Sequence, residues 1–223
     1  MGERLSVATA TAPSLVADFW DDACKHLVKR DRVMKKLIPR LGEGRLESRG
    51  DAFTTLARSI VGQQISVKAA QAVWDRFVAL TAGPSSRLAP NAVLALDAPH
   101  IRAAGLSARK VEYLCDLAEH FQSGAVRPAR WREMDDEEII EELVGIRGIG
   151  RWTAEMFLIF HLLRPNVLPL DDIGLIKGIS VNYFSGEPVS RAEAREVGDA
   201  WAPYRSVATW YIWRSLDPMP VSY

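Results

Sequence analysis

In its second half the chain reads Leu143-Val-Gly-Ile-Arg-Gly-Ile-Gly-Arg-Trp-Thr-Ala154. The apolar residues before Gly145 indicate a helix that ends there, and the residues from Arg151 onward indicate a second helix. Gly148 and Gly150 fit a turn that is too tight for side chains. This stretch therefore predicts a helix-hairpin-helix.

The predicted hairpin offers backbone donors to an anion. The first N–H groups of a helix have no partner within the helix and lie at the positive end of its dipole. Because glycines let a ligand approach the backbone closely, we take Gly148, Gly150, Arg151 and Thr153 as candidate phosphate contacts. A glycine-rich turn without a ligand is the alternative, since short glycine motifs are weak evidence.

A second informative stretch reads Leu168-Pro-Leu-Asp-Asp-Ile-Gly-Leu-Ile-Lys177. Asp172 lies 22 positions after Gly150, beyond a loop that contains proline, at the predicted start of another helix. A carboxylate at that place is stabilised by the helix dipole and by free N–H groups. Taken alone, Asp172 is most simply an N-cap, and Asp171 is the alternative if the register is wrong by one position.

Helical signals dominate the rest of the chain, and the two-residue alternation typical of strands is missing. We therefore expect an all-α fold with few strands or none. The predicted helices cover residues 14–27, 52–61, 67–80, 108–121, 136–144, 151–163, 173–183, 191–200 and 204–216. The predicted N-caps are Asp51, Ser66, Ser107, Asp135 and Ser190, and the predicted helix-ending or interrupting glycines are Gly42, Gly83 and Gly124.

The hairpin, the proline loop and Asp172 together resemble the helix-hairpin-helix (HhH-GPD) DNA glycosylases, and most closely the 3-methyladenine DNA glycosylase II (AlkA-like) branch. Three further stretches agree with this resemblance: Ser59-Ile-Val-Gly-Gln-Gln-Ile-Ser-Val-Lys-Ala-Ala70, Gly105-Leu-Ser-Ala-Arg-Lys-Val-Glu-Tyr-Leu114 and Pro203-Tyr-Arg-Ser206. The similarity covers roughly residues 51–216 and suggests a compact form without the N-terminal β-rich domain of some larger members.

The resemblance implies a two-lobed helical fold with the active-site cleft between the lobes. We expect one domain over residues 1–223, with lobe A at about 14–58 plus 165–216 and lobe B at about 59–164, which contains the hairpin at about 136–163. The implied function is that of a monofunctional DNA glycosylase. Such an enzyme flips alkylated bases such as 3-methyladenine and 7-methylguanine out of duplex DNA and hydrolyses their glycosidic bonds in base-excision repair.

The resemblance also implies a role for Asp172 in catalysis. Cleavage of an N-glycosidic bond gives the sugar oxocarbenium character, so a fixed anion stabilises the transition state more than the substrate. Trp152 stands where bifunctional members of the superfamily carry a lysine that forms a Schiff base, and an indole cannot do so. We therefore expect hydrolysis without lyase activity.

The implied base pocket contains Trp152 and Trp213, whose rings could stack on a cationic alkylated base. Core packing is the alternative for both tryptophans. Gln64 matches the wedge residue that fills the gap left by the flipped nucleotide. Two functions remain as rivals: a DNA-binding module without catalysis, and a glycosylase/lyase for oxidised bases.

No metal or organic cofactor is expected, although the resemblance allows a monovalent cation on the hairpin carbonyls. Two cysteines, Cys24 and Cys115, are too few for a disulfide framework, a four-cysteine zinc site or a cysteine-ligated iron-sulfur cluster. The four histidines show no metal-ligand spacing and are expected to be structural or surface residues: His26, His100, His120 and His161.

The overall charge is balanced, with 28 basic and 28 acidic side chains, which does not by itself indicate a DNA-binding protein. The charges are segregated along the chain, however, because residues 25–40 are mainly basic and residues 133–142 mainly acidic. Solvated helix faces are the alternative for both runs. We expect double-stranded DNA with alkylated bases as the partner and a monomeric protein.

No apolar run approaches the roughly 20 residues that a membrane helix needs, and residues 1–12 lack the features of a secretory signal. We therefore expect no membrane association. The expected location is cytoplasmic, in the bacterial cytosol at the nucleoid.

Overall fold

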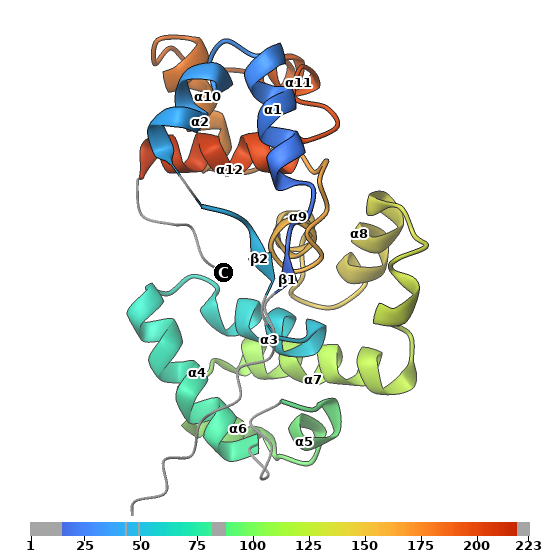
Figure 1. The fold of residues 1–223 in the computed structure, drawn as a ribbon. Coiled ribbons are helices and arrows are strands. Elements are labelled where there is room, and N and C mark those ends of the chain that lie inside the picture. Colours follow the sequence, from blue (N-terminus) through green and yellow to red (C-terminus); the bar gives the residue numbers. More distant parts are fainter. Residues whose placement is uncertain (1–14, 43, 49, 82–87, 218–223) are drawn as a thin grey trace, which may run out of the picture.

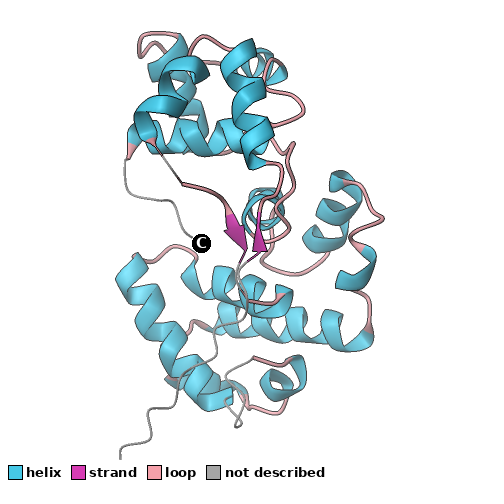
Figure 2. Cartoon of the chain, viewed as in Figure 1, coloured by secondary structure: helices cyan, strands magenta, loops and turns pink. Residues whose placement is uncertain are grey.

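The computed structural model describes residues 15–42, 44–48, 50–81 and 88–217, which form two helical lobes joined by extended segments (Figure 1). Within these residues the chain contains twelve α-helices, a short 3₁₀ helix and a two-stranded antiparallel ribbon (Figure 2). The predicted all-α class is confirmed.

The first lobe is built from both ends of the described chain. It contains α1 (Trp20–Arg30), α2 (Met34–Leu41), α10 (Ile173–Tyr183), α11 (Arg191–Asp199) and α12 (Arg205–Leu216). Helix α12 contacts α1, α2 and α10, and its residues from Ser206 to Trp213 are all buried. The crossing of α10 and α12 is close, because a Cβ atom at Gly178 would lie 2.3 Å from Ile212 Cγ2.

A buried polar cluster joins the N-terminal helices of this lobe to the C-terminal ones. One oxygen of Asp31 accepts hydrogen bonds from the amides of Val33 and Met34 at the start of α2. The other accepts a 2.8 Å hydrogen bond from the Tyr183 hydroxyl at the end of α10. Because Asp31 is only 8% exposed, these bonds satisfy a carboxylate that would otherwise be costly to bury.

The second lobe is built around α7 (Ala108–Ser123). Helix α7 contacts α3 (Ala52–Gly62), α5 (Pro90–Leu94) and α6 (Ala98–Ala103), and α4 (Val67–Thr81) packs on α3 and α6. The chain then passes through the 3₁₀ helix η1 (Pro128–Arg130) to α8 (Asp136–Val144) and α9 (Arg151–Phe160). Helix α9 contacts α8 and α3. All of its residues from Thr153 to Phe160 are buried, so α9 is an internal helix, and only the beginning of its first turn is exposed to solvent.

The ribbon consists of β1 (Leu15–Val16) and β2 (Glu47–Ser48), with Leu15 opposite Ser48 and Val16 opposite Glu47. In Figure 2 it lies between the two lobes, where the chain passes from one to the other. With two residues in each strand, it leaves the helical character of the fold unchanged.

Side-chain caps explain where many helices begin. The predicted N-caps Asp51, Ser107, Asp135 and Ser190 each accept a hydrogen bond from a first-turn amide, and Ser66 accepts one from Ala69. Gly124 ends α7 in the left-handed conformation, with a φ of 75°. Gly83 lies outside the described residues.

Three helices were not predicted from the sequence. Helix α2 contains Pro39 and lies within the basic run, whereas α5 and α6 carry proline in their first turns, where this residue is tolerated. Three predicted limits also differ by three residues or more, since α1 begins at Trp20 and ends at Arg30, and α9 ends at Phe160. The expected lobe boundary at residues 58 and 59 falls inside α3, whose contacts with α4, α7 and α9 associate it with the second lobe.

The basic run is a solvated helix surface in the structure. Six of its side chains are exposed and form no ion pair within the described part of the chain: Lys29, Arg30, Arg32, Lys35, Lys36 and Arg40. The acidic run includes internal contacts as well, because Glu142 accepts a 2.7 Å hydrogen bond from the indole nitrogen of Trp131.

Candidate active site

The hairpin connects α8 to α9 through a turn that leaves the start of α9 open. Gly148 has a φ of 83°, in the left-handed region that favours glycine. Gly150 is the N-cap residue of α9, and no side chain caps this helix. The first amides of α9 are therefore available to an external acceptor, which is the arrangement that binds phosphate.

The two glycines of the turn serve different purposes. A Cβ atom at Gly148 would lie 2.2 Å from the ring of Tyr113 on α7, so this glycine is required for packing as well as for its backbone conformation. A Cβ atom at Gly150 would have nothing within 4 Å, and its φ of −91° is accessible to any residue. The space beside Gly150 is thus open for a ligand.

The side chains of two other candidate phosphate contacts, Arg151 and Thr153, are paired or buried within the protein. The Arg151 guanidinium donates to Glu137 on α8 at 2.9 Å and to Glu155 at 3.1 Å, and the side chain of Thr153 is buried. Both residues can offer a ligand their backbone amides at the start of α9. Their side chains instead stabilise the hairpin and the core.

Glu155 is a buried carboxylate one turn into α9. Its residue is 4% exposed, one carboxylate oxygen accepts from Arg151, and the other has no hydrogen-bond partner among the described residues. Burial raises the pKa of Glu155 to about 7, partly opposed by Arg151 and reinforced by the negative charges of Asp171 and Glu137.

Asp172 is the N-cap of α10, and three N–H groups hold its carboxylate. Its Oδ1 atom accepts from the amide of Leu175 at 2.6 Å and from Trp213 Nε1 at 2.7 Å. Its Oδ2 atom accepts from Trp152 Nε1 at 2.9 Å. These donors and the helix start stabilise a negative charge at a fixed position. The indole of Trp152 thereby connects the hairpin helix to Asp172.

The surroundings of Trp213 explain the Asp-Ile-Gly sequence at the start of α10. A Cβ atom at Gly174 would lie 3.1 Å from Asp172 Oδ1 and 3.3 Å from Trp213 Cδ1, so a larger residue would crowd both. The ring of Trp213 stacks on Phe160 with 5.7 Å between ring centroids, and Trp213 is 8% exposed. Trp213 is therefore a core residue that also donates a hydrogen bond to the Asp172 carboxylate.

Asp171 and Ile173, the two neighbours of Asp172, face other surroundings. Asp171 forms an ion pair with Arg191, and its side chain is 44% exposed. Ile173 is 84% exposed beside the carboxylate, which is unusual for a large apolar residue. Only Asp172 of the two aspartates is held by both tryptophans, so the geometry distinguishes it from the one-position alternative.

The turn between α3 and α4, residues 63–66, contains the predicted wedge and is called the wedge turn below. Gln64 has a φ of 60° and is exposed, and the following residues Ile65 and Val67 are 40% and 89% exposed. The neighbouring Gln63 donates a 2.8 Å hydrogen bond from its side-chain amide to the carbonyl of Gly148. The wedge turn therefore lies directly beside the hairpin.

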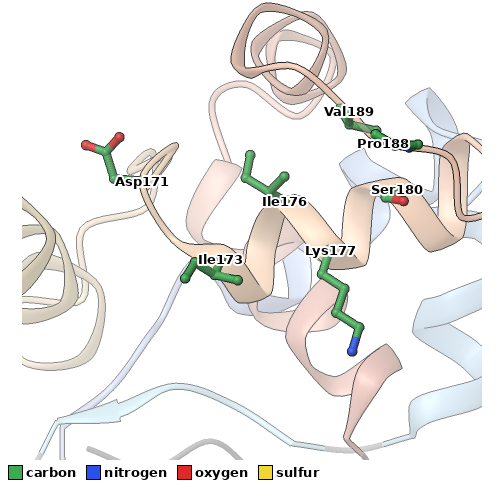
Figure 3. A pocket seen from close by; sticks show the side chains of 7 residues that line it. All are labelled: Asp171, Ile173, Ile176, Lys177, Ser180, Pro188 and Val189. Carbon is green, nitrogen blue, oxygen red and sulfur yellow. The ribbon is translucent and has the colours of Figure 1, made fainter. Parts of the chain in front are cut away.

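A surface hollow of about 370 Å³ lies next to the start of α10, away from Asp172 and the two tryptophans. Figure 3 shows Asp171, Ile173, Ile176 and Ser180 from this part of the chain together with Pro188 and Val189 from the following loop. Neither Asp172 nor the two tryptophans line it. The carboxylate and the indoles thus form a packed cluster that is separate from this hollow.

With this geometry in view, comparison with known proteins identifies the family. Residues 57–203 match the model of the HhH-GPD superfamily of base excision DNA repair proteins. The chain belongs to the HhH-GPD superfamily. It is 32% identical over 194 residues to DNA-3-methyladenine glycosylase 1 of Schizosaccharomyces pombe, and the match covers 85% of each chain.

Two solved HhH-GPD structures resemble this one closely. A DNA-3-methyladenine glycosidase from Bacillus halodurans is 34% identical with a TM-score of 0.83, and the match covers 92% of this chain and 93% of the other. The S. pombe 3-methyladenine DNA glycosylase Mag1 in complex with abasic DNA is 30% identical with a TM-score of 0.74, covering 91% of this chain and 100% of the other.

Sequence reasoning on this HhH-GPD chain missed three features of the site. It treated Trp152 and Trp213 as stacking surfaces or core residues, whereas both indoles donate to Asp172 across 20 and 41 positions of sequence. It also assigned no role to Gln63 or Lys110. The resemblance of Gly105–Leu114 to the family was the only signal for Lys110. It did not indicate what this side chain contacts.

Within the described residues, no group of three or more His, Cys, Asp and Glu side chains could hold a metal ion. None of the helices in that part of the chain has the length and apolar character needed to cross a bilayer.

Proposed function

We propose that this chain is a monofunctional DNA-3-methyladenine glycosylase of type II, which acts as a monomer on alkylated bases in double-stranded DNA. The observation that carries this proposal is the Asp172 carboxylate, fixed by two indoles and a helix start beside the open amides of the hairpin. The names of its relatives, DNA-3-methyladenine glycosylases, support the choice of substrate.

Asp172 would act on the sugar. As the bond between C1′ and the base nitrogen breaks, the base leaves with the electron pair and the sugar becomes cationic. The fixed carboxylate stabilises that cation, and water then adds to C1′ and releases a proton. The products are the free base and an abasic site, so strand breakage requires a separate treatment.

Trp152 and Trp213 would contact the flipped base. A cationic base such as 3-methyladenine is attracted to the electron-rich faces of indoles. Neither indole can form a Schiff base with the sugar, which separates this proposal from the glycosylase/lyase alternative. The same two side chains orient Asp172, so in this proposal the pocket and the catalytic anion are built from one cluster.

The hairpin and the wedge turn would hold the DNA. Amides near Gly148, Gly150, Arg151 and Thr153 would bind backbone phosphates, and Gln64 would occupy the gap left by the flipped base. A monovalent cation on the hairpin carbonyls remains part of the proposal. The Ile146 and Gly148 carbonyls already accept hydrogen bonds, from the Ile149 amide and from Gln63, so a cation would have to share these oxygens or use others.

We also propose that the protein acts in the bacterial cytosol at the nucleoid, because its proposed substrate is genomic duplex DNA. The internal ion pairs of Arg151 and the balanced overall charge are consistent with few phosphate contacts. Binding should therefore depend only modestly on salt.

A base-release experiment tests the proposal. Methylated duplex DNA is incubated with the protein, and the released bases are separated by chromatography, with borohydride added in a parallel reaction. We expect 3-methyladenine and 7-methylguanine to be released, no covalent adduct, and strand breaks only after alkali. Binding without release would favour the non-catalytic module, and a borohydride-trapped adduct would favour the lyase.

A further inference from the structure

Lys110 on α7 contacts the backbone of the end of α3 and of the wedge turn. Its Nζ atom donates to the carbonyl of Val61 at 2.8 Å and to the carbonyl of Gln63 at 2.7 Å. These carbonyls lie at the end of α3, where a helix leaves acceptors without partners and where its dipole favours a cation. Burial of this ammonium group lowers the pKa of Lys110.

The residue that follows these contacts has an unfavourable backbone conformation. Gln64 has a φ of 60°, and a residue with a Cβ atom adopts this left-handed conformation at a cost in free energy. Such a conformation persists only where the surroundings fix it. Lys110 binds the carbonyl of Gln63, which belongs to the peptide bond that leads into Gln64.

A second contact extends the support to the hairpin. Gln63 donates from its side-chain amide to the carbonyl of Gly148, and Gly148 packs against the ring of Tyr113. Tyr113 is three residues beyond Lys110 on α7, so the two lie on neighbouring positions of one helix face. One face of α7 therefore supports both the wedge turn and the hairpin.

We propose that Lys110 and Gln63 are positioning residues that fix the wedge turn relative to the hairpin, so that Gln64 enters the duplex when the start of α9 docks on a phosphate. Lys110 fixes the backbone on the α3 side of Gln64, and Gln63 joins this turn to Gly148. The inference rests on the proposed function, because it needs Gln64 as the wedge. It adds the residues through which base flipping depends on phosphate docking.

The test combines variants of Lys110 and Gln64. Lys110→Met keeps the alkyl chain and removes the donors, whereas Gln64→Gly removes the wedge and relieves its backbone conformation. In single-turnover reactions, Lys110→Met should slow the release of 3-methyladenine by about tenfold, since small displacements of a positioned group are costly. The fluorescence of 2-aminopurine opposite the lesion, which reports wedge insertion, should fall in parallel.

Binding to undamaged duplex separates this role from a phosphate contact. Lys110→Met should change that affinity by less than about twofold, because Lys110 acts through Gln64 and makes no contribution to phosphate docking. Lys36→Met is the matched control, since Lys36 is exposed on α2 and forms no ion pair within the described residues. It should release base at the rate of the wild type.

The double variant decides whether Lys110 acts through the wedge. In the Gln64→Gly background, Lys110→Met should slow base release by less than about twofold further, because residues that act through one another are not additive. A full second tenfold loss would overturn the inference. So would a normal rate in Lys110→Met when Gln64→Gly is slow.

Failure of the proposed function gives a different result. If Gln64→Gly alone releases base at the normal rate, then the wedge assignment is wrong and the inference falls with it. If Lys110→Met does not fold, as judged by circular dichroism, Gln63→Leu replaces it in the same scheme. That variant removes only the hydrogen bond to Gly148, and a normal rate of release would overturn the inference.

Discussion

Helices α9 and α10 begin within one site, yet their starts are built in opposite ways. Gly150 leaves the first turn of α9 without a side-chain cap, whereas Asp172 caps α10 with a carboxylate that also accepts from two indoles. Both starts present the positive end of a helix dipole. The first is open to an anion from outside, and the second already contains the anion of the protein itself.

This difference shows how one physical device serves two functions in the proposed enzyme. A phosphate bound at α9 would locate the DNA, and the carboxylate at α10 would stabilise the cationic sugar. The indole of Trp152, from the first turn of α9, donates to Asp172, so the two helix starts are in direct contact. Exchanging a single feature between them tests each role separately.

The largest effect is expected at α10. Asp172→Asn retains the size and capping ability of the side chain but removes its charge, and it should slow base release by about 100-fold or more. The loss should be steepest for a neutral lesion such as hypoxanthine. Cationic 3-methyladenine already has a weakened glycosidic bond and needs less help from the protein. Single-turnover release of each base measures both effects.

Asp171→Asn is the matched control for this variant. Asp171 is paired with Arg191 at the surface, and the two indole N–H groups donate to Asp172 instead, so its replacement should leave the rate within about threefold of the wild type. Normal release by Asp172→Asn together with an inactive Asp171→Asn would place the catalytic carboxylate one position earlier. Normal release by both would exclude the mechanism.

A smaller effect is expected at α9, where Gly150→Asp gives this helix the cap that α10 has. Aspartate is a favourable N-cap and its Cβ atom meets open space, so the melting temperature should stay the same or rise. The new carboxylate would occupy the phosphate position and repel DNA. Affinity for undamaged and damaged duplex should fall by about tenfold or more, as measured by titration.

Two further variants isolate the cause of that loss. Gly150→Asn adds a cap of the same size without charge and should lose less affinity than Gly150→Asp. Gly148→Ala should lower the melting temperature, because the added Cβ atom meets Tyr113 and the φ of 83° disfavours alanine. Equal affinity of Gly150→Asp and the wild type would reject phosphate docking at this helix start.

The sequence was sufficient to locate both helix starts. Glycines and an aspartate at a helix N-terminus are local signals, since they act on backbone groups within a few residues. The capped starts at Ser107, Asp135 and Ser190 were predicted for the same reason. Helix α2 was missed because Pro39 and a basic run conceal its pattern, although Met34 and Leu37 are buried.

The contacts that hold the site together across long stretches of sequence could not be predicted. Trp213 reaches Asp172 across 41 positions, and Lys110 reaches Gln63 across 47. Such pairs depend on how helices pack against one another within each lobe, which residue spacing does not specify. The same limit explains why Arg151 was assigned to phosphate from the motif, while its guanidinium in the structure is paired with Glu137 and Glu155.

The smallest effect on DNA affinity is expected when a buried carboxylate inside α9 is replaced. Glu155 is buried, and burial raises its pKa from the usual 4.5 to about 7. The unfolded chain releases this proton near pH 4.5, whereas the folded protein retains it up to about pH 7. The free energy of unfolding should therefore fall by roughly 3 kcal/mol as the pH rises through this window.

Glu155→Gln should remove most of that pH dependence, because it replaces the buried acid with a neutral group that can still accept from Arg151. Urea unfolding at pH 5 and pH 8 measures the change. Glu193→Gln is the control, since hydrogen bonds from Ser190 lower the pKa of Glu193, whose contribution is lost only at more acidic pH. An unchanged difference between pH 5 and pH 8 in Glu155→Gln would contradict the assignment.

The same variant should change DNA affinity at pH 8 by less than about threefold. Glu155 lies one turn inside α9, whereas the phosphate would bind at the first amides of this helix.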